Sequence, residues 1–250
     1  MVGLIIAPNN VSYLNSVLSL IAVALGAGAA GTLNMWYESD LDALMTRTCL
    51  RPIPTGQVTK NQALFFGVLL SVGSVTLLYF SSNLMSASLL LITICFYFFI
   101  YTVWLKRRTP QNIVIGGAAG ALPPVIGWTI ATGSLSLEPL ILFLIIFLWT
   151  PSHFWALSIY KSNDYKKAKI PMLPIIYGIE KTKKNIFIYS LLMLPTISAP
   201  YFISFLSEIY FYPALALTIY YIYLCGTLLK VKKSTEVNTL ARKIFLYSIF

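Results

Sequence analysis

The stretch LMSASLLLITICFYFFIYTVWLKRR, residues 84–108, consists of 22 uncharged residues followed by three basic ones. Twenty-two residues of α-helix span about 33 Å, slightly more than the roughly 30 Å hydrocarbon core of a bilayer. An uncharged run of this length is typical of a helix surrounded by lipid. The stretch therefore predicts a membrane-spanning helix whose basic end lies at the membrane surface.

Apolar segments of similar length recur along the chain. Met1–Pro8 and Ala241–Phe250 are shorter and predict the end of one helix and the start of another; Met1–Pro8 lacks the basic region and cleavage site of a secretory signal peptide. We expect an all-α, polytopic transmembrane bundle, a single domain over residues 1–250 with seven full spans and two terminal partial helices. The predicted spans are 14–33, 62–80, 84–105, 113–131, 138–159, 185–206 and 209–229.

The composition excludes an ordinary soluble domain. Of the 250 residues, 58% are hydrophobic and 10% are charged, and the mean hydropathy is +0.77. The net charge of +10 would suggest a nucleic-acid partner in a soluble protein; here it indicates loops held at one membrane face or facing an anionic substrate, and no nucleic acid. The three cysteines are far apart and form no Cys-x-x-Cys, so a zinc or redox motif is not expected.

The basic residues follow a clear topological pattern. All 18 lie after every second span or in the terminal tail, and the loops near 81–83, 132–137 and 207–208 contain none. The positive-inside rule places the basic loops on the cytoplasmic side. Six of the eight acids share that side, Glu138 and Glu208 being the exceptions. We therefore expect the charged chemistry at one face of the membrane.

An acidic cluster stands where the first span ends, in NMWYESDLDALMTRTCLRP, residues 34–52. Asn34, Glu38 and Asp42 are four residues apart and would share one face of a helix. Neighbouring carboxylates repel each other unless a cation bridges them, and such oxygen ligands suit Mg²⁺ together with substrate phosphates. A solvated helix end with internal ion pairs explains the spacing equally well.

Basic side chains on the same side could bind an anionic group. Arg47 and Arg51 are also four residues apart, and guanidinium groups make paired hydrogen bonds to phosphate oxygens. Lys106, Arg107 and Arg108 could together receive a diphosphate leaving group. Taken singly, each of these three is explained as the basic flank of a span.

Two further polar positions are candidates. Asp164, in YKSNDYKKAKIPMLP, is the only Asp outside the first cluster and is either a ligand for a second Mg²⁺ or a solvated acid among lysines. His153, the only histidine, lies near the inner end of a span, where packing and functional roles compete. If the helix continues past Tyr160, all three residues share a face, with His153 about 16 Å deeper than Asp164. Such a face would suit a substrate with a charged head and a long apolar body.

The segment GGAAGALPP, residues 116–124, lies within a predicted span. Its small residues allow close helix approach, and Pro123 and Pro124 interrupt the backbone hydrogen bonds. We expect a packing role for this segment, with cavity lining as the alternative.

Four blocks resemble the UbiA-type intramembrane prenyltransferases, and within that family the protoheme IX farnesyltransferase branch, or heme O synthases. The blocks are NMWYESDLDALMTRT, LKRRTPQNIVIGGAAGALPPVIGW, WTPSHFWAL and DYKKAKIPMLP, in the family's order over residues 34–174, and ARKIFLYSIF resembles the family's last helix. The resemblance implies nine spans around a central cavity and the transfer of farnesyl from farnesyl diphosphate to a vinyl group of heme b, with water added, giving heme O. It also implies Mg²⁺ as cofactor, a bacterial cytoplasmic (inner) or mitochondrial inner membrane, and a link to heme A synthase or terminal oxidase assembly.

The resemblance assigns roles to matching residues. Asn34, Glu38 and Asp42 would hold Mg²⁺ and the diphosphate, and Asp164 would be the acid of the second motif and a further metal ligand. Asp40 belongs to the block but lies off that helix face. Diphosphate-binding roles fall on Arg47, Arg51, Lys106 and Arg107. His153 would lie near the heme and could touch its iron.

The chain departs from the family pattern at several points. Position 168 is Ala, where the wider family has a second acid, and Ser152 stands where the branch usually has Pro. Family members carry a full helix before the position of Met1 and a longer last helix, so the chain is expected to be shortened at both ends.

Two other functions stay open. One is prenylation of an aromatic quinone precursor by another UbiA-type enzyme. The other is a transporter or channel, against which the one-sided acids and the lack of an evident internal repeat argue.

Overall fold

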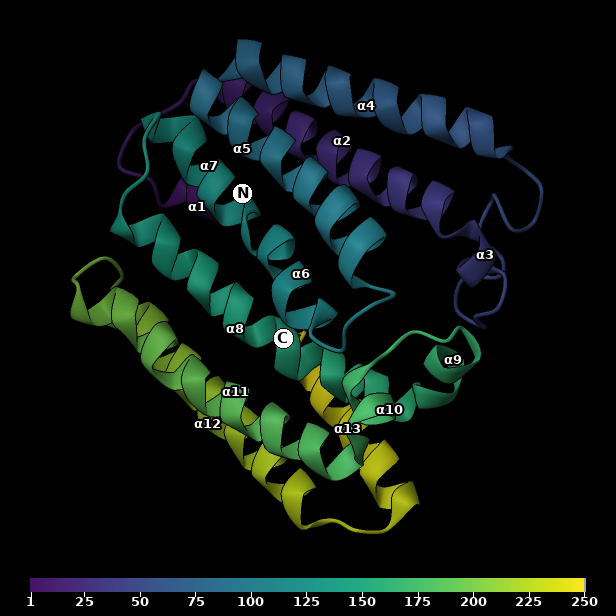
Figure 1. The fold of residues 1–250 in the computed structure, drawn as a ribbon. Helices are drawn as coiled ribbons and strands as arrows, with labels where there is room; N and C mark the ends of the chain where they lie inside the picture. The colour runs from purple at the N-terminus through teal and green to yellow at the C-terminus, as the bar shows by residue number, and fades with distance from the viewer. Residues whose placement is uncertain (250) are drawn as a thin grey trace. The chain divides into compact units, whose positions relative to one another are not determined.

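The computed structural model describes residues 1–249, and this part of the chain is helical without strands (Figure 1). Seven of its helical segments are long and apolar enough to cross a membrane, which confirms the expected bundle of seven spans. The protein is therefore an integral, multi-pass membrane protein. The segments are Tyr13–Tyr37, Lys60–Ser81, Leu84–Leu105, Asn112–Thr132, Leu137–Tyr160, Gly178–Phe202 and Glu208–Lys230.

The chain divides into two compact units. The first contains Met1–Arg107 with Ala118–Phe143, and the second contains Arg108–Gly117 with Leu144 to the end of the described chain. Two helices contribute to both, α6 (Asn112–Ala121) and α8 (Leu137–Tyr160). The first unit also holds α1 (Val2–Ile5), α2 (Tyr13–Tyr37), α3 (Ser39–Asp42), α4 (Lys60–Ser81), α5 (Leu84–Cys95), the π-helix η1 (Phe96–Leu105) and α7 (Pro123–Thr132). The second also holds α9 (Ser162–Lys167), α10 (Leu173–Ile176), α11 (Gly178–Phe202), α12 (Glu208–Lys230) and α13 (Ser234–Tyr247).

Local sequence sets where the helices of the first unit begin. Thr59 starts α4 with a capping box, and the Asn83 side chain accepts a hydrogen bond from Ser86 N at 2.9 Å where α5 starts. The expected interruption by proline is confirmed: α6 ends at Ala121 and α7 begins at Pro123, whose ring fits the first turn of a helix.

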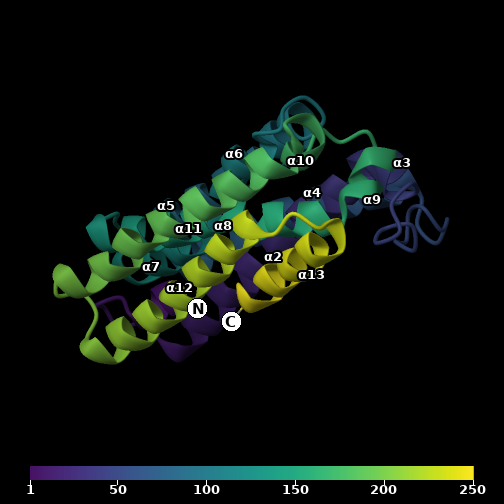
Figure 2. The ribbon, with the colours of Figure 1, turned by 90° about the horizontal axis from the view of Figure 1, so that it is seen from below.

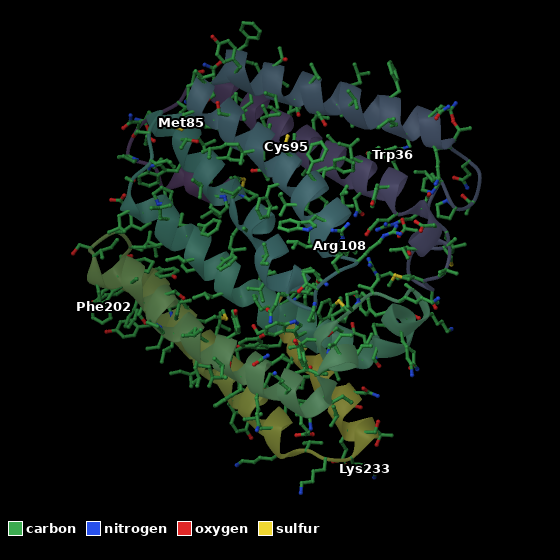
Figure 3. All side chains as sticks on the ribbon, viewed as in Figure 1. Trp36, Met85, Cys95, Arg108, Phe202 and Lys233 are labelled. Atoms are coloured by element: carbon green, nitrogen blue, oxygen red, sulfur yellow. The ribbon has the colours of Figure 1, made fainter. Side chains whose placement is uncertain are left out.

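Two side-chain contacts give the directions of the helices in the first unit. Ser19, early in α2, bonds Ser81 at the end of α4, with the two hydroxyls 3.0 Å apart. Asn34, late in α2, bonds Thr102, late in η1, at 3.2 Å. Hence α4 is antiparallel to α2, whereas α5 and η1 run parallel to it. The carboxyl-terminal ends of α2 and η1 therefore meet, and they bring together the charged residues that follow them. Figure 3 labels Trp36 near that end of α2 and Met85 at the start of α5.

Small residues let these helices approach closely, as expected in a membrane where apolar packing must replace lipid contacts. At Gly26 of α2, an added Cβ would lie 2.7 Å from Leu90 of α5, and at Gly67 of α4 it would lie 2.8 Å from Leu33 of α2. The buried core of this unit is formed by Ala22, Ala30, Leu33, Leu78, Leu90, Ile94, Ile126 and Ile130.

The tightest approach in the first unit is between α1 and α7, and it yields a stability prediction. A Cβ atom added at Gly3 would lie 2.0 Å from the backbone oxygen of Pro124. We expect Gly3→Ala to destabilise the protein by about 1–3 kcal/mol, because backbone rather than a flexible side chain must move. In the control Gly28→Ala the new Cβ meets nothing within 4 Å, so stability should stay equal or rise slightly. Thermal unfolding in detergent measures both, and equal midpoints would contradict the close packing.

In the second unit, α11 and α12 lie side by side (Figures 1 and 2). A buried lysine joins their charged ends. Lys183, only 1% exposed, donates to Glu180 Oε1 at 2.7 Å and to the backbone oxygen of Val231 at 2.6 Å. Since Val231 follows the last residue of α12, this ammonium group fixes the start of α11 to the end of α12.

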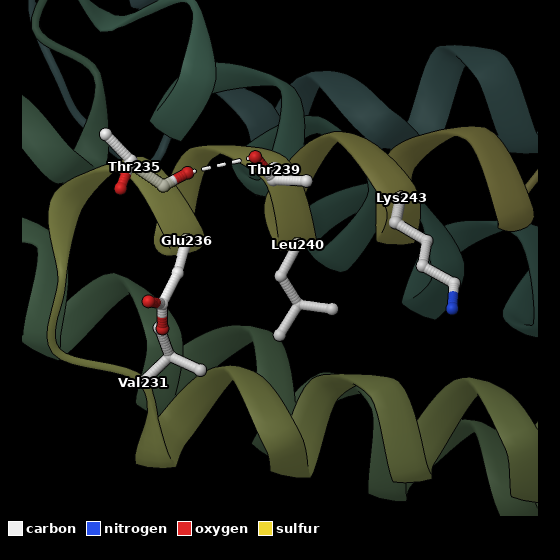
Figure 4. A pocket seen from close by; sticks show the side chains of 6 residues that line it. All are labelled: Val231, Thr235, Glu236, Thr239, Leu240 and Lys243. Carbon is white, nitrogen blue, oxygen red and sulfur yellow. Dashed lines mark hydrogen bonds between the residues drawn. The ribbon is translucent and has the colours of Figure 1, made fainter.

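The last helix, α13, turns back against α12 and buries Val237, Ala241 and Ile244. Leu240 and Lys243 lie on another side of α13. They line a groove of approximately 360 Å³ (Figure 4), together with Val231, Thr235, Glu236 and Thr239. The second terminal partial helix is thus present and amphipathic.

Three helix boundaries in the second unit differ from the sequence-based expectation. α11 begins at Gly178 instead of 185, because Lys183 and its neighbours lie in helical turns beyond the apolar run and find partners there. It ends at Phe202 instead of 206, and Ser204 adopts a left-handed φ of 59°. α13 begins at Ser234 instead of 241, since its first turns are polar.

Candidate functional site

The acidic cluster lies in the first unit where α2 gives way to α3. α2 ends at Tyr37, and Glu38, with φ −101° and ψ 15°, separates the two helices, so the expectation of one continuous helix was wrong. The backbone hydrogen bonds that join Asn34, Glu38 and Asp42 at intervals of four residues are nevertheless present across this break. Glu38 N donates to Asn34 O and Asp42 N to Glu38 O, both at 2.9 Å.

The cluster is nearly buried. Asn34 is 6% exposed, Glu38 1% and Asp42 4%. Buried carboxylates are costly unless they are paired and hydrogen-bonded. The burial therefore argues against a solvated helix end, although internal ion pairs are present.

Both acids of the buried cluster are neutralised by basic side chains at short range. Lys106 Nζ, just after η1, donates to Glu38 Oε2. Arg51 Nη1 donates to both oxygens of Asp42, at 3.0 and 2.8 Å. The second oxygen of Glu38, Oε1, is buried and has no hydrogen-bond partner among residues 1–249. An unpartnered carboxylate oxygen in a buried site is the kind of exception that a ligand or ion explains.

Asp40 lies outside the buried cluster, as the sequence indicated. Its carboxylate is 56% exposed and accepts hydrogen bonds from Arg107 at 2.9 and 3.1 Å, and the Arg107 guanidinium lies 5.3 Å from the Tyr37 ring centre. Partial burial acts to raise the pKa of Asp40, but the hydrogen bond and charge of Arg107 outweigh it and hold the pKa below its ordinary 3.8. This pair therefore stabilises the fold at neutral pH and loses its contribution as pH falls below 3.8.

Arg47 and Arg51, four residues apart in the sequence, do not lie on a helix. Residues 43–58 form turns without a helix; within them, Arg51 bonds Asp42, whereas Arg47 is exposed. Arg108, labelled in Figure 3, is exposed and belongs to the second unit. Of the predicted cations, Arg51, Lys106 and Arg107 are therefore the ones that the structure places on the acids.

A cavity of approximately 230 Å³ lies beside α2 in the same unit. Gly26, Ala27, Ala30 and Gly31 line one wall, and they precede Asn34 along one side of α2. The other walls come from Leu90, Thr93, Ile94, Tyr97, Ala119, Gly120, Pro123 and Ile126. The segment 116–124 thus contributes to a cavity wall as well as to packing. An apolar space follows the charged cluster along the same helix.

His153, in the second unit, is held on three sides. Its ring stacks on Trp149 at 4.3 Å and on Phe245 at 4.5 Å, and Nδ1 lies 2.6 Å from the Ser248 hydroxyl. The Ser248 hydroxyl donates its only hydrogen to Phe245 O at 2.7 Å, so it accepts a hydrogen bond from His153 Nδ1. The tautomer is thereby fixed with an unprotonated Nε2, which has no hydrogen-bond partner among residues 1–249.

Asp164 is half-buried on α9, also in the second unit. The helix that carries His153 does not continue to it. α8 ends at Tyr160, and Lys161, with φ −105° and ψ 18°, separates it from α9. The shared face expected for His153, Tyr160 and Asp164 is therefore absent.

No three His, Cys, Asp or Glu side chains among residues 1–249 lie close enough together to bind a metal ion on their own. A metal at the acidic cluster would need further oxygen ligands. Asn34 and substrate phosphates can supply them.

Comparison with known proteins identifies the family. The profile of the UbiA prenyltransferase family matches residues 1–249. The chain belongs to the UbiA prenyltransferase family.

Relatives within the UbiA family are similar over nearly the whole chain. A protein of Pelagibacter ubique (strain HTCC1062) named protoheme IX farnesyltransferase is 65% identical over 248 residues, which cover 99% of this chain and 82% of the relative. A protein of Mesorhizobium japonicum named protoheme IX farnesyltransferase 2 is 48% identical and covers 99% and 79%.

Several solved structures share the fold. A digeranylgeranylglyceryl phosphate synthase superposes with a TM-score of 0.81 at 21% identity, covering 98% of this chain and 86% of that one. A UbiA homologue from Archaeoglobus fulgidus, bound to DMAPP and Mg²⁺, superposes with a TM-score of 0.72 at 17% identity, covering 99% and 91%.

One residue of the site was missed by sequence reasoning. Thr102, fully buried, accepts a hydrogen bond from Asn34 Nδ2 at 3.2 Å. A threonine within an apolar span gives no sequence signal that it contacts the acidic cluster. The only indication is that Thr102 lies four residues before Lys106. In this UbiA fold the two residues meet Asn34 and Glu38, which are also four apart.

Proposed function

We propose that this enzyme transfers the farnesyl group of farnesyl diphosphate to a vinyl group of protoheme IX (heme b), with water added, to give heme O and diphosphate. The observation that supports it most directly is the buried acidic cluster with its own cations, which begins one helical turn along α2 from residues that line an apolar cavity. Membership of the UbiA family and the names of the relatives point to the same reaction.

The residues present fit Mg²⁺. Their donor atoms are oxygens, which this ion prefers, and the buried, unpartnered Glu38 Oε1 is a carboxylate oxygen without any other use in the structure. Glu38, Asp42 and Asn34 would hold the ion together with diphosphate oxygens. For Asp164, in the second unit, we propose a metal-ligand role from its place in the second family motif alone. When bound, Mg²⁺ would stabilise the negative charge that develops on the departing diphosphate.

Cationic side chains would bind the diphosphate itself. Arg51, Lys106 and Arg107 now neutralise the acids; when a metal ion takes over that task, they can turn to the phosphate oxygens. Arg47, exposed on the neighbouring loop, would be the outermost of the set. Such fixed positive charges stabilise the leaving group as the carbon–oxygen bond breaks.

The apolar cavity would take the farnesyl chain. It is lined by glycine, alanine and aliphatic side chains along α2, and it follows directly on Asn34. A hydrocarbon chain anchored by its diphosphate at the cluster would therefore enter apolar surroundings, where its burial is favourable.

The proposed reaction breaks one carbon–oxygen bond of farnesyl diphosphate and forms one carbon–carbon and one carbon–oxygen bond on heme b. The bond between farnesyl C1 and the diphosphate oxygen breaks, and the electron pair leaves with the diphosphate. The terminal vinyl carbon of heme b forms a bond to C1, and water adds to the neighbouring carbon and releases one proton. Aromatic faces near the cluster, among them Trp36, Tyr37 and Phe98, could shield the intermediate cations.

We place His153 at the heme. Its hydrogen bond to Ser248 leaves Nε2 with a free lone pair, which is the form of histidine that binds iron. The basic face would lie on the cytoplasmic side of a bacterial inner membrane, or on the matrix side of a mitochondrial one. Heme O would pass from there to heme A synthase or to terminal oxidase assembly.

Acceptor choice tests the proposal. Membranes carrying the protein, given farnesyl diphosphate and Mg²⁺, should prenylate heme b and leave 4-hydroxybenzoate, an aromatic quinone precursor, unchanged. Product analysis by chromatography and mass spectrometry distinguishes the two acceptors. Prenylation of the aromatic acid with no heme O formed would contradict the proposal and favour another branch of the family.

A further inference from the structure

Thr102 occupies an unusual place in the fold. It is fully buried within η1, a π-helix of ten residues, and such helices are frequent at functional sites. Its hydroxyl donates to the backbone oxygen of Tyr97, five residues earlier, at 2.9 Å. Most other threonines inside helices of this chain, such as Thr182, donate only to a carbonyl oxygen four residues earlier or nearer. Among the helical threonines of residues 1–249, Thr102 alone also bonds a side chain of the acidic cluster.

The count of donors and acceptors fixes the orientation of the Asn34 side chain. A threonine hydroxyl has one hydrogen, and Thr102 donates it to Tyr97 O. Toward Asn34 the hydroxyl can therefore only accept a hydrogen bond. The group of Asn34 that faces it must therefore be the amide nitrogen. The second hydrogen of Nδ2 goes to Glu38 Oε2 at 2.7 Å.

This arrangement leaves one atom of the amide unused. Both hydrogens of Nδ2 are engaged, whereas Oδ1 has no hydrogen-bond partner among the described residues. On Glu38, Oε2 accepts from Asn34 and from Lys106, whereas Oε1 is unpartnered. Asn34 and Glu38 therefore each have one side-chain oxygen, Oδ1 and Oε1, that makes no hydrogen bond within the described residues.

We propose that Thr102 is a positioning residue that holds the Asn34 amide with its nitrogen toward Glu38, so that Asn34 Oδ1 and Glu38 Oε1 stay available as metal ligands. The inference rests on the proposed function of the acidic cluster. It gives the π-helix a role, because its winding brings the Thr102 hydroxyl to the Tyr97 carbonyl and leaves only an acceptor for Asn34.

Binding of Mn²⁺ in the presence of inorganic pyrophosphate tests the proposal on the full chain in detergent, with free Mn²⁺ followed by electron paramagnetic resonance. Thr102→Val keeps the shape of the side chain but accepts no hydrogen bond. The dissociation constant should rise about 10–100-fold, as is typical when the partner of a metal ligand is lost. Thr102→Ser keeps the hydroxyl and should bind Mn²⁺ like the unchanged protein.

Thr182→Val is the matched control. Thr182 is also fully buried and also donates at 2.9 Å to a carbonyl of its own helix, but it has no link to the cluster. Equal Mn²⁺ affinity of the Thr102→Val and Thr182→Val proteins would overturn the proposal. So would a Thr102→Ser protein as weak as Thr102→Val, because packing would then explain the loss. If Thr102→Val does not fold, Thr102→Ala carries the same prediction.

Failure of the proposed function gives a different result. In that case the unchanged protein would bind no Mn²⁺ with pyrophosphate, and Glu38→Gln would make no difference. A protein that binds Mn²⁺ through Glu38 but is indifferent to Thr102→Val retains the metal site and refutes only the role of Thr102.

Discussion

Glu38→Gln is expected to lower heme O formation by about 100-fold or more, and Asp42→Asn by a similar factor. Both substitutions keep the size of the side chain, but they replace one acceptor oxygen with an NH₂ donor and remove a negative charge from a site that is 1% or 4% exposed. The charge that neutralises Mg²⁺ and holds it over the diphosphate would be lost. Initial rates of heme O formation by membranes with equal amounts of protein measure the effect.

Asp40→Asn is the matched control for these two variants. It removes the same charge from the same short segment, but the Asp40 carboxylate is 56% exposed and pairs with Arg107. Its activity should remain close to that of the unchanged protein, since an exposed pair contributes little. Activity losses of equal size in all three variants would show that activity depends on the net charge of the segment and not on the two buried carboxylates.

Lys106→Met is expected to destabilise the metal-free protein by about 3–5 kcal/mol. Glu38 is 1% exposed and Lys106 19%, so removal of the ammonium group leaves a buried carboxylate without its counter-ion. The loss should be visible as a lower unfolding temperature in detergent with chelator. Addition of Mg²⁺ should recover part of it, because the metal ion would neutralise the same carboxylate.

Two further variants distinguish the cost of an unpaired buried Glu38 carboxylate from the cost of removing any basic side chain. Arg107→Met breaks a pair whose partners are 36% and 56% exposed, and should cost at most about 1 kcal/mol. The double variant Glu38→Gln with Lys106→Met should be more stable than Lys106→Met alone, since no unpaired charge remains. If Lys106→Met and Arg107→Met cost the same, Glu38 does not depend on Lys106.

The spans and the proline interruption could be predicted because they depend on local composition. Uncharged runs of spanning length give membrane helices, and Pro123 cannot continue the backbone hydrogen bonds of α6. The charged end of the first unit also follows from sequence, through the regular alternation of basic and neutral loops. Helix ends such as the start of α11 could not be predicted. They depend on the tertiary partners of Lys183.

The candidate site was predictable in its acids but not in its connections. The spacing of Asn34, Glu38 and Asp42 is visible in the sequence. The partner of each acid is not, because Lys106 and Arg51 reach the acids through turns whose geometry no local pattern encodes. The π-winding of η1 gives no signal either, since its residues are as apolar as those of an ordinary span. Thr102 was therefore invisible until the helices were placed together.

The central claim is that farnesyl leaves diphosphate and is captured by a heme vinyl group with addition of water. The most direct measurement uses purified protein in a bilayer with heme b, farnesyl diphosphate and Mg²⁺ in H₂¹⁸O, followed by mass spectrometry of the heme product. We expect heme b to gain one farnesyl group and one hydroxyl group that carries ¹⁸O. A farnesylated product without ¹⁸O, or heme b recovered unchanged while farnesyl is transferred elsewhere, would contradict the account.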